Sequence, residues 1–357
     1  MNSLMQTTAS TTTRTIDPIT DPRWQRLLNR HAQASAFHTP GWLMALRRTY
    51  GYEASVLTTA EAGEDLQNGL VFCRVKSWLT GRRIVSLPFA DHCEPLVEDP
   101  EELRLLLAAA AEEVKKDNLK YFEIRPRTPF GESVDGSWRE TSEFSLHVID
   151  LRPSLDSLYS NLHKSCIQRK IKRAEKEACT YAQGRSEEFL NGFYKLMLLT
   201  RRRHQLPPQP LAWFRNLLDS FEADAQIHFA LKDGRPIASI FTHSFKNSVV
   251  YKYGCSDQEF HNLGGMPFLF WNVIQNAKQS GATELDLGRS DLDQPGLIEF
   301  KEHLGGARSS LKYYSFPARE FKKATSGWQA RMFRRGVARV PDKLLIGAGR
   351  ILYRHLG

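Results

Sequence analysis

The chain has 357 residues and a formal net charge of +9, with 41% hydrophobic, 11% aromatic and 25% charged residues. This length exceeds the roughly 100–200 residues of one domain and predicts two domains, while the ordinary globular composition excludes a wholly disordered or fibrous chain. The five cysteines are scattered and form no Cys-x-x-Cys pair. This pattern argues against a disulfide framework and a structural zinc site, and it favours a reducing compartment. No histidine spacing resembles a metal motif, so we expect no metal.

Residues 1–20 are rich in Ser and Thr and lack an apolar run, so we expect a disordered lead rather than a signal peptide. The longest aliphatic run, residues 105–111, is far shorter than the ~20 residues of a membrane span. The sequence therefore predicts a cytoplasmic protein that does not cross a membrane.

The first predicted domain, residues 21–150, mixes strands and helices. Apolar residues recur at helical spacing in the helix expected at 100–118. The other expected elements are a helix at 37–50 and strands at 54–59, 70–75, 83–87 and 121–125.

The second predicted domain, residues 151–316, has the same order of strands, helix and strand. Three successive strands joined by turn sequences predict an antiparallel meander. Lys115 precedes Glu123 by the same spacing as Lys278 precedes Asp286, which suggests an internal duplication. We expect a basic helical segment at 154–178, a second helix at 187–205, strands at 226–232, 237–243 and 249–253, a helix at 266–280 and a strand at 284–287.

Two segments concentrate the positive charge. Residues 164–176 hold six Lys/Arg and one acid, and residues 322–357 hold nine Lys/Arg and one acid. Localised charge predicts anionic partners. On the first segment, Arg169 and Lys172 are candidates for binding an anionic acceptor, joined by Arg125 from the first domain; a solvated helix face is the alternative. No aromatic residue interleaves with this run, so we expect no DNA binding.

The segment LDLGRSDLDQPGLIEFKEHLGG, residues 285–306, resembles the FemABX and BioF2-like (CelD-like) acetyltransferase families. The resemblance extends in order over residues 21–316, through SAFHTPGWLMALRRTYG, RRIVSLPFADHCEPL, YFEIRP and RKIKRAEKEA. It implies an α/β (α+β) fold of two tandem acetyltransferase-like (GNAT) lobes, with mixed, mostly antiparallel sheets flanked by helices and a C-terminal helical tail.

The resemblance also implies roles for individual residues. Lys301 would stabilise the oxyanion of an acyl-transfer reaction, and its loss would lower turnover without harming the fold; a plain surface lysine is the alternative. Asp286 and Asp291 would accept a proton or orient the nucleophile, unless they only serve turns. Tyr251, Tyr253 and Phe300 are candidates for lining the substrate cleft, with packing as the alternative for the strand tyrosines.

The donor site is expected at the start of the helix at 266–280. His261, Gly264 and Gly265 stand where acetyl-CoA enzymes carry a pyrophosphate-binding loop, although only Gly264 matches that pattern. Helix N-termini bind anions through unpaired N–H groups, but a simple helix-entry turn is the alternative. The chain lacks a long helical arm, so acyl-CoA is the expected donor co-substrate, with aminoacyl-tRNA as the alternative and no bound cofactor.

These features together predict an acyltransferase that acts on an amine or hydroxyl of a cell-envelope precursor or exopolysaccharide. A catalytically silent glycan- or membrane-binding assembly factor is the alternative. The tail, residues 317–357, carries an apolar stripe flanked by Lys and Arg. This pattern predicts peripheral contact of residues 322–357 with an anionic membrane, unless the stripe packs back on a lobe.

Overall fold

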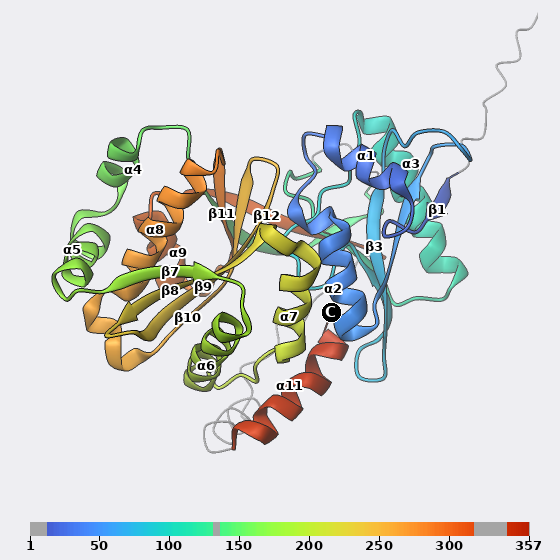
Figure 1. The fold of residues 1–357 in the computed structure, drawn as a ribbon. Helices are drawn as coiled ribbons and strands as arrows, with labels where there is room; N and C mark the ends of the chain where they lie inside the picture. The colour runs from blue at the N-terminus through green and yellow to red at the C-terminus, as the bar shows by residue number, and fades with distance from the viewer. Residues whose placement is uncertain (1–12, 131–135, 318–340, 357) are drawn as a thin grey trace, which may run out of the picture.

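The computed structural model describes residues 13–130, 136–317 and 341–356. One twelve-stranded sheet runs through the molecule in the order β1-β2-β3-β4-β5-β12-β6-β11-β10-β9-β8-β7 (Figure 1). The strands are β1 (Arg14–Ile16), β2 (Glu53–Thr58), β3 (Leu70–Ser77), β4 (Gly81–Val85), β5 (Phe122–Ile124), β6 (Arg139–Asp150), β7 (Thr180–Gly184), β8 (Ala225–Lys232), β9 (Arg235–Phe245), β10 (Ser248–Ser256), β11 (Glu284–Asp291) and β12 (Ala307–Phe316).

Helices cover both faces of this sheet in each half. The α-helices are α1 (Pro22–Arg30), α2 (Pro40–Tyr50), α3 (Pro100–Lys116), α4 (Leu155–Asn161), α5 (Arg169–Lys176), α6 (Glu187–Arg203), α7 (Leu211–Phe221), α8 (Gly265–Gln279), α9 (Pro295–His303) and α11 (Asp342–Leu356). Short helical turns are η1 (Ala36–His38), η3 (Lys164–Gln168), η4 (Glu222–Asp224) and η5 (Gln258–Leu263).

Neighbouring residues of a strand pack into hydrophobic clusters on opposite faces of the sheet. On β2, Val56 packs into the cluster that contains α2, whereas its neighbour Leu57 packs into the cluster that contains α3. On β9, Phe241 packs with α6 and α7, whereas Ile240 packs with α8. This period of two places a helical layer on each side of the sheet in both halves.

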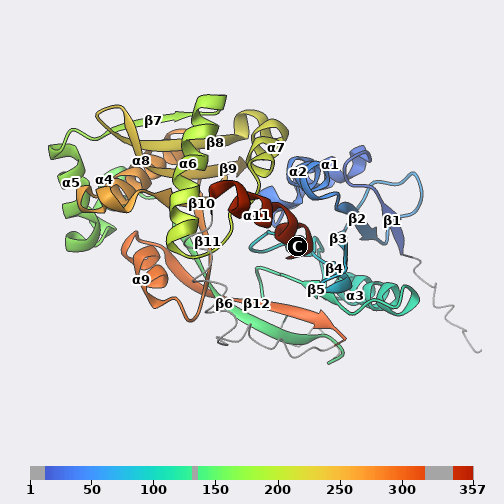
Figure 2. The same cartoon turned by 90° about the horizontal axis from the view of Figure 1, so that it is seen from below.

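The two halves are joined by strands and by a shared core. β6 lies between β12 and β11, and β12 also pairs with β5 of the first half (Figure 2). On one face, α2 packs against α7, and the fully buried rings of Trp42 and Trp213 meet edge to face at 5.2 Å. The lobes therefore form one continuous packed unit.

The two halves repeat one arrangement. In each, a helix connects two parallel strands: α3 lies between β4 and β5, and α8 lies between β10 and β11. The matched sequences around Lys115–Glu123 and Lys278–Asp286 cover these two crossovers. The expected tandem acetyltransferase-like architecture is confirmed, whereas the exact domain boundary at 150 stays a prediction.

Some local expectations were wrong. Residues 14–16, expected within a disordered lead, form β1 and pair with β2. The basic segment at 154–178 is not one helix but α4, a π-helical turn and α5. β6, β7 and β12 were not expected, because their residues are only partly buried and their pairing partners lie far away in sequence.

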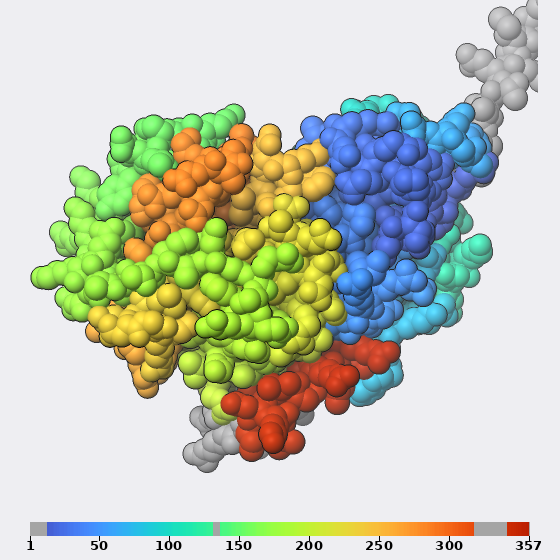
Figure 3. All heavy atoms as spheres, viewed as in Figure 1, coloured from blue at the N-terminus to red at the C-terminus, as the bar shows by residue number. Residues whose placement is uncertain are grey.

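The tail ends in α11, which packs on both lobes (Figure 3). Leu345 is buried, and Gly349 approaches Pro208 so closely that a Cβ there would lie 2.0 Å from its carbonyl oxygen. Tyr52 donates to the Arg354 carbonyl at 2.9 Å. The helix therefore packs back on the protein, while residues 318–340 of the expected tail lie outside the described residues. Among the described helices, none is long and apolar enough to span a bilayer.

Candidate active site

β10 and β11 diverge in the middle of the sheet. They pair in parallel only over Ser248–Val250 and Glu284–Asp286. Beyond that point β10 stays with β9, while β11 stays with β6 and carries a bulge at Gly288, where φ is +70°. On the side toward β11, the backbone groups of β10 beyond Val250 thus face an opening, while those on the other side still pair with β9.

A cavity of about 540 Å³ lies at this opening, and we call it the donor cleft. Its wall includes the N-terminus of α8, whose unpaired N–H groups and dipole favour negative charge. Lys170 of α5 and Arg203 of α6 add two cations, while Asp257 in the wall is paired with Arg235. Other lining residues are Thr200, His204, Tyr251, Gly254, Ser256, His261, Gly265, Leu297 and Phe300.

The expected donor-binding residues form the entry to α8. Gly264 is the N-cap with φ +77°, and a Cβ there would lie 2.3 Å from the Lys170 carbonyl oxygen. Gly265 lines the cleft, as does His261, whose Nε2 lies 2.9 Å from Ser256 Oγ. Only glycine therefore allows α5 and the start of α8 to meet at this wall.

Gly264→Ala is expected to weaken donor binding at least tenfold, because the contact with Lys170 must open and α8 must shift. The left-handed backbone alone costs about 1–2 kcal/mol. Gly281→Ala is a matched control, since Gly281 also has a positive φ (+87°) but no atom lies within 4 Å of a Cβ there. Calorimetric titration of both variants with acyl-CoA checks this; equal affinities would contradict the role of the α8 N-terminus.

Tyr251 and Tyr253, both candidates for lining the substrate cleft, pack in different clusters of the protein. Tyr251 packs edge to face on Phe270 at 4.9 Å and lines the cleft together with Phe300. Tyr253 instead packs among α6 and α7, and its hydroxyl accepts from Trp213 Nε1 at 2.8 Å. A bulge between the two tyrosines breaks the strand alternation, so the expectation that both line one cleft was wrong.

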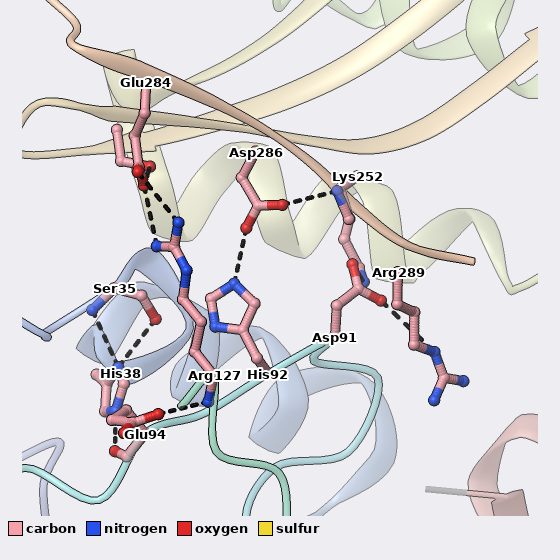
Figure 4. A network of polar contacts seen from close by, with 12 residues as sticks. Ser35, His38, Asp91, His92, Glu94, Arg127, Lys252, Glu284, Asp286 and Arg289 are labelled. Atoms are coloured by element: carbon pink, nitrogen blue, oxygen red, sulfur yellow. Dashed lines mark hydrogen bonds and ion pairs between the residues drawn. The ribbon is translucent and has the colours of Figure 1, made fainter. Parts of the chain in front are cut away.

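Charged side chains of β10 and β11 meet Asp91 and His92 of the first lobe where the two strands diverge (Figure 4). Lys252 of β10 lies 2.9 Å from Asp91, which is carried by the loop after β4. Arg289 of β11 lies 4.0 Å from the same carboxylate and donates to Tyr313 at 2.9 Å. Burial raises the pKa of Asp91, but these two cations outweigh it and lower the pKa overall.

Asp286 and His92 form a second buried pair across the lobes. His92 Nε2 lies 2.7 Å from Asp286 Oδ2, and the Gly288 N–H donates to Oδ1 at 2.7 Å (Figure 4). Burial raises the pKa of Asp286, but the hydrogen bond and charge of His92, together with Arg127 and Gly288, lower it to about 2. Asp286 is therefore a carboxylate that fixes the His92 ring.

The stability of the protein is expected to depend on Asp286 at low pH. A depressed folded-state pKa stabilises the fold above the unfolded value of about 4, and this contribution is lost as the pH falls toward about 2. At neutral pH this contribution to the free energy of unfolding is about 2 kcal/mol. Chemical unfolding of wild type and Asp286→Asn between pH 2 and pH 6 checks this. If both show the same pH slope, the Asp286–His92 pair contributes nothing.

Lys301 lies in α9 and is 3% exposed, so the alternative of a surface lysine was wrong. Its ammonium donates to the carbonyls of Gly288 at 2.8 Å and Arg289 at 3.0 Å, which leaves one of its three N–H groups without a partner among the described residues. Burial lowers the pKa of Lys301 to about 8, although Asp91 and Asp286 act in the opposite direction. Because the Gly288 and Arg289 carbonyls accept from this ammonium, its loss is expected to cost some stability, and the expectation that the fold stays intact remains a prediction.

The charges at the divergence do not cancel. Lys252, Arg289 and Lys301 are three cations, while Asp91 and Asp286 are two carboxylates, so about one positive charge remains. Arg125 and Arg127 pair with Glu123 and Glu284, and the buried Glu94, whose pKa burial raises, adds a carboxyl group on the groove side. The excess comes from Arg289, whose side chain is 35% exposed, so this charge lies at the edge of the network, where it favours an anion such as the oxyanion of an acyl-transfer intermediate.

A second cavity of about 540 Å³ lies between the lobes, and we call it the interlobe groove. Its carboxylates are Glu94, Glu284 and Asp286, and its cations are Arg127 and Lys246. His92 also lines it, close to its Asp286 partner. The groove and the donor cleft meet adjacent residues of β10, because Val250 lines the groove and Tyr251 lines the cleft.

The remaining candidates lie elsewhere. Arg125 is engaged with Glu123 and donates to the carbonyls of Leu87 and Ala90, so it supports the loop that carries Asp91. Arg169 and Lys172 are exposed on α5 and do not line the donor cleft, whereas Lys170 between them does. Asp291 is exposed at the end of β11 and accepts from Gln294. The catalytic and binding roles of these residues stay predictions.

One group of side chains offers metal-ligand atoms. Among the described residues, His163, Cys166 and His303 place such atoms within 4.8 Å of one another. His163 Nδ1 already accepts the Cys166 N–H at 3.1 Å, and the His163 and His303 rings meet at a tilt, with centroids 4.1 Å apart. His163 Nδ1 is therefore committed to this helix cap.

Sequence reasoning missed Asp91, His92, Lys252 and Arg289. The polar run Asp91-His92 inside an otherwise apolar strand-and-loop segment was a usable signal, as was Lys252 between two strand tyrosines. Which charges they meet depends on the contact between the lobes, and no local spacing encodes that contact.

Comparisons with known proteins agree with this geometry. Residues 163–302 match the family model described as an acetyltransferase (GNAT) domain. The solved structure of FemX has a TM-score of 0.68 with 15% identity, covering 85% of this chain and 96% of that one. No curated protein matches the chain significantly.

Two further solved structures share the fold. The C-terminal domain of a protein assigned as lysylphosphatidylglycerol synthetase, from Agrobacterium fabrum, has a TM-score of 0.54 at 14% identity and covers 87% of this chain and 92% of that one. A tandem GNAT protein from the clavulanic acid pathway has a TM-score of 0.52 at 13% identity, covering 87% and 100%. Residues 163–302 thus match a GNAT acetyltransferase domain, and the chain shares the fold of FemX.

Proposed function

We propose that this protein transfers an acyl group from acyl-CoA to an amine or hydroxyl of a cell-envelope precursor or exopolysaccharide. The observation that carries the proposal is the donor cleft at the divergence of β10 and β11, next to the charged network that contains Lys301 and Asp286. The GNAT domain match over residues 163–302 supports the reaction class. The names of FemX and of lysylphosphatidylglycerol synthetase among the structural neighbours support an envelope acceptor.

The donor cleft suits the parts of an acyl-CoA. Its phosphates would meet the N-terminus of α8, Lys170 and Arg203. The amides of its arm would hydrogen-bond to the β10 backbone beyond Val250, in the manner of an added strand. The acyl carbonyl would then lie at the divergence, next to Tyr251 and Phe300.

The chemistry is direct attack by the acceptor on the thioester carbonyl. The new C–N or C–O bond forms as the C–S bond breaks, and the CoA thiolate leaves. The neutral form of His92, held by Asp286, accepts the proton of the acceptor. The positive charge around Lys301 stabilises the oxyanion that develops on the carbonyl.

The interlobe groove is the proposed acceptor site, because His92, the proposed base, lines it. Its three carboxylates exceed its two cations, which suits an amine or hydroxyl end rather than a phosphate. An anionic portion of the acceptor would therefore remain outside the groove.

Transfer of a radiolabelled acyl group tests the proposal. The protein is incubated with labelled acetyl-CoA or longer acyl-CoA and with lipid-linked precursors, amino sugars and polysaccharide, and release of the CoA thiol is followed in parallel. Protein-dependent labelling of one acceptor class is expected. Binding of acyl-CoA without transfer to any of them would instead favour the assembly-factor alternative, and transfer only from aminoacyl-tRNA would correct the donor.

A further inference from the structure

Exposed apolar side chains gather on one face of the molecule, around α11. Large exposed hydrophobic residues number nine in the described chain, and five of them lie on α11 or on the turn between β3 and β4. Trp78 is 79% exposed, Leu344 65% and Ile351 62%. The His355 ring of α11 contacts the Trp78 ring at 5.3 Å, so the helix and the turn form one surface. The other two members are Leu79 and Leu356.

The outer side of α11 has two stripes at helical spacing. Leu344, Ala348 and Ile351 form an exposed apolar stripe, while Leu345 and Gly349 face the lobes. Lys343, Arg350 and Arg354 form an exposed basic stripe beside it. The single acid of the helix, Asp342, pairs with Arg202 of α6. The face therefore combines apolar side chains with uncompensated positive charge.

We propose that this face, defined by α11 and the Trp78–Leu79 turn, docks on an anionic lipid bilayer. A folded core holds α11 in place, so the helix need not rearrange to present its outer side (Figure 3). The apolar stripe and Trp78 enter the interfacial region, and the basic stripe contacts lipid phosphates. The positive charge selects an anionic bilayer over a second copy of this chain, which would bring the same basic stripe against itself.

The docking face and the donor cleft are connected through neighbouring residues of α6. Arg202 holds the start of α11, and its neighbour Arg203 lines the donor cleft. Docking would therefore bring the donor cleft close to the bilayer surface. This consequence rests on the proposed function, whereas vesicle binding itself does not.

Vesicle co-sedimentation of the full chain tests the proposal. At low salt we expect binding to vesicles of phosphatidylglycerol and phosphatidylcholine, release at high salt, and no binding to phosphatidylcholine alone. Each basic residue near anionic lipid contributes about 1 kcal/mol, or about fivefold, so Arg350→Gln with Arg354→Gln should weaken binding roughly 25-fold. Arg169→Gln with Lys172→Gln removes the same charge from exposed α5 and should change binding little.

Insertion of the apolar side chains into the bilayer can be measured separately. Brominated lipids should quench wild-type tryptophan fluorescence, and Trp78→Phe should abolish most of that quenching. Ile351→Ser should weaken binding about tenfold or more, and its exposed position leaves the fold intact. The proposal is overturned if anionic vesicles do not bind at low salt, if both charge variants weaken binding equally, or if light scattering shows a dimer of the wild type that Ile351→Ser does not form. Acyl transfer to a soluble acceptor is measured separately, so failure of docking and failure of the proposed reaction are distinguishable.

Discussion

Lys301→Met is expected to lower turnover by about 10²–10³-fold, the usual cost of removing one oxyanion-stabilising group. Methionine keeps the length and apolar packing of the buried side chain but removes the ammonium. The carbonyls of Gly288 and Arg289 lose their donor, which also costs about 1–3 kcal/mol of stability. Turnover should be compared with that of wild type at saturating substrate, below the melting temperature of the variant.

Lys278→Met is the matched control. Lys278 also donates to two backbone carbonyls, those of Leu151 and Arg152, but it lies at the far end of α8 from the donor cleft. Its loss should cost some stability and leave turnover nearly unchanged. Equal turnover losses in the two variants would mean that Lys301 only supports the fold.

The pH dependence of turnover separates these roles further. Since burial lowers the pKa of Lys301 to about 8, its ammonium loses a proton as the pH rises through this value. If the ammonium stabilises the oxyanion, wild-type turnover should fall above pH 8, because the neutral amine carries no positive charge. Turnover that rises through this pH in wild type but not in Lys301→Met would instead identify Lys301 as a base.

Lys252→Met is expected to destabilise the protein by about 3–5 kcal/mol, because it leaves the buried Asp91 carboxylate without its closest cation. The methionine can still pack on the rings of Phe37 and Trp42 that the lysine contacts. The double variant Asp91→Asn with Lys252→Met should recover more than half of this loss, because no isolated charge remains in the lobe contact. Urea unfolding of wild type, both single variants and the double variant measures the coupling.

Arg215→Met is the control for an exposed pair. Arg215 bonds Glu187 at the surface, where such pairs contribute about 1 kcal/mol or less. Additive losses in the Asp91 and Lys252 variants, with no recovery in the double variant, would show that the pair does not couple the lobes.

The fold could be predicted where local patterns set it. The meander β8–β10, the helix α8 and the strand β11 follow from alternation, turn residues and helical spacing. The internal repeat was visible because Lys115–Glu123 and Lys278–Asp286 lie in equivalent crossovers. β6 and β12 were missed because each is stabilised by distant strands and not by its own apolar pattern.

The candidate site was only partly predictable, for a different reason. Lys301 and Asp286 were found through a motif near the C-terminal end of the second lobe. Asp91 and His92, about two hundred residues earlier, meet them only because β6 and β12 bring the lobes together. The bulge after Tyr251 likewise depends on the pairing of β9 with β10, so the separation of Tyr251 from Tyr253 could not be read from the strand itself.

Calorimetric titration of the purified protein with acyl-CoA tests the central claim most directly. The account predicts one-to-one binding that weakens about tenfold or more in Lys170→Ala and in Arg203→Ala, whose side chains line the donor cleft. Lys172→Ala should bind like wild type, because this lysine is exposed on the same helix as Lys170 without lining the cleft. Absence of acyl-CoA binding by the wild-type protein, or the same affinity in all three variants, would contradict a donor site at the divergence of β10 and β11.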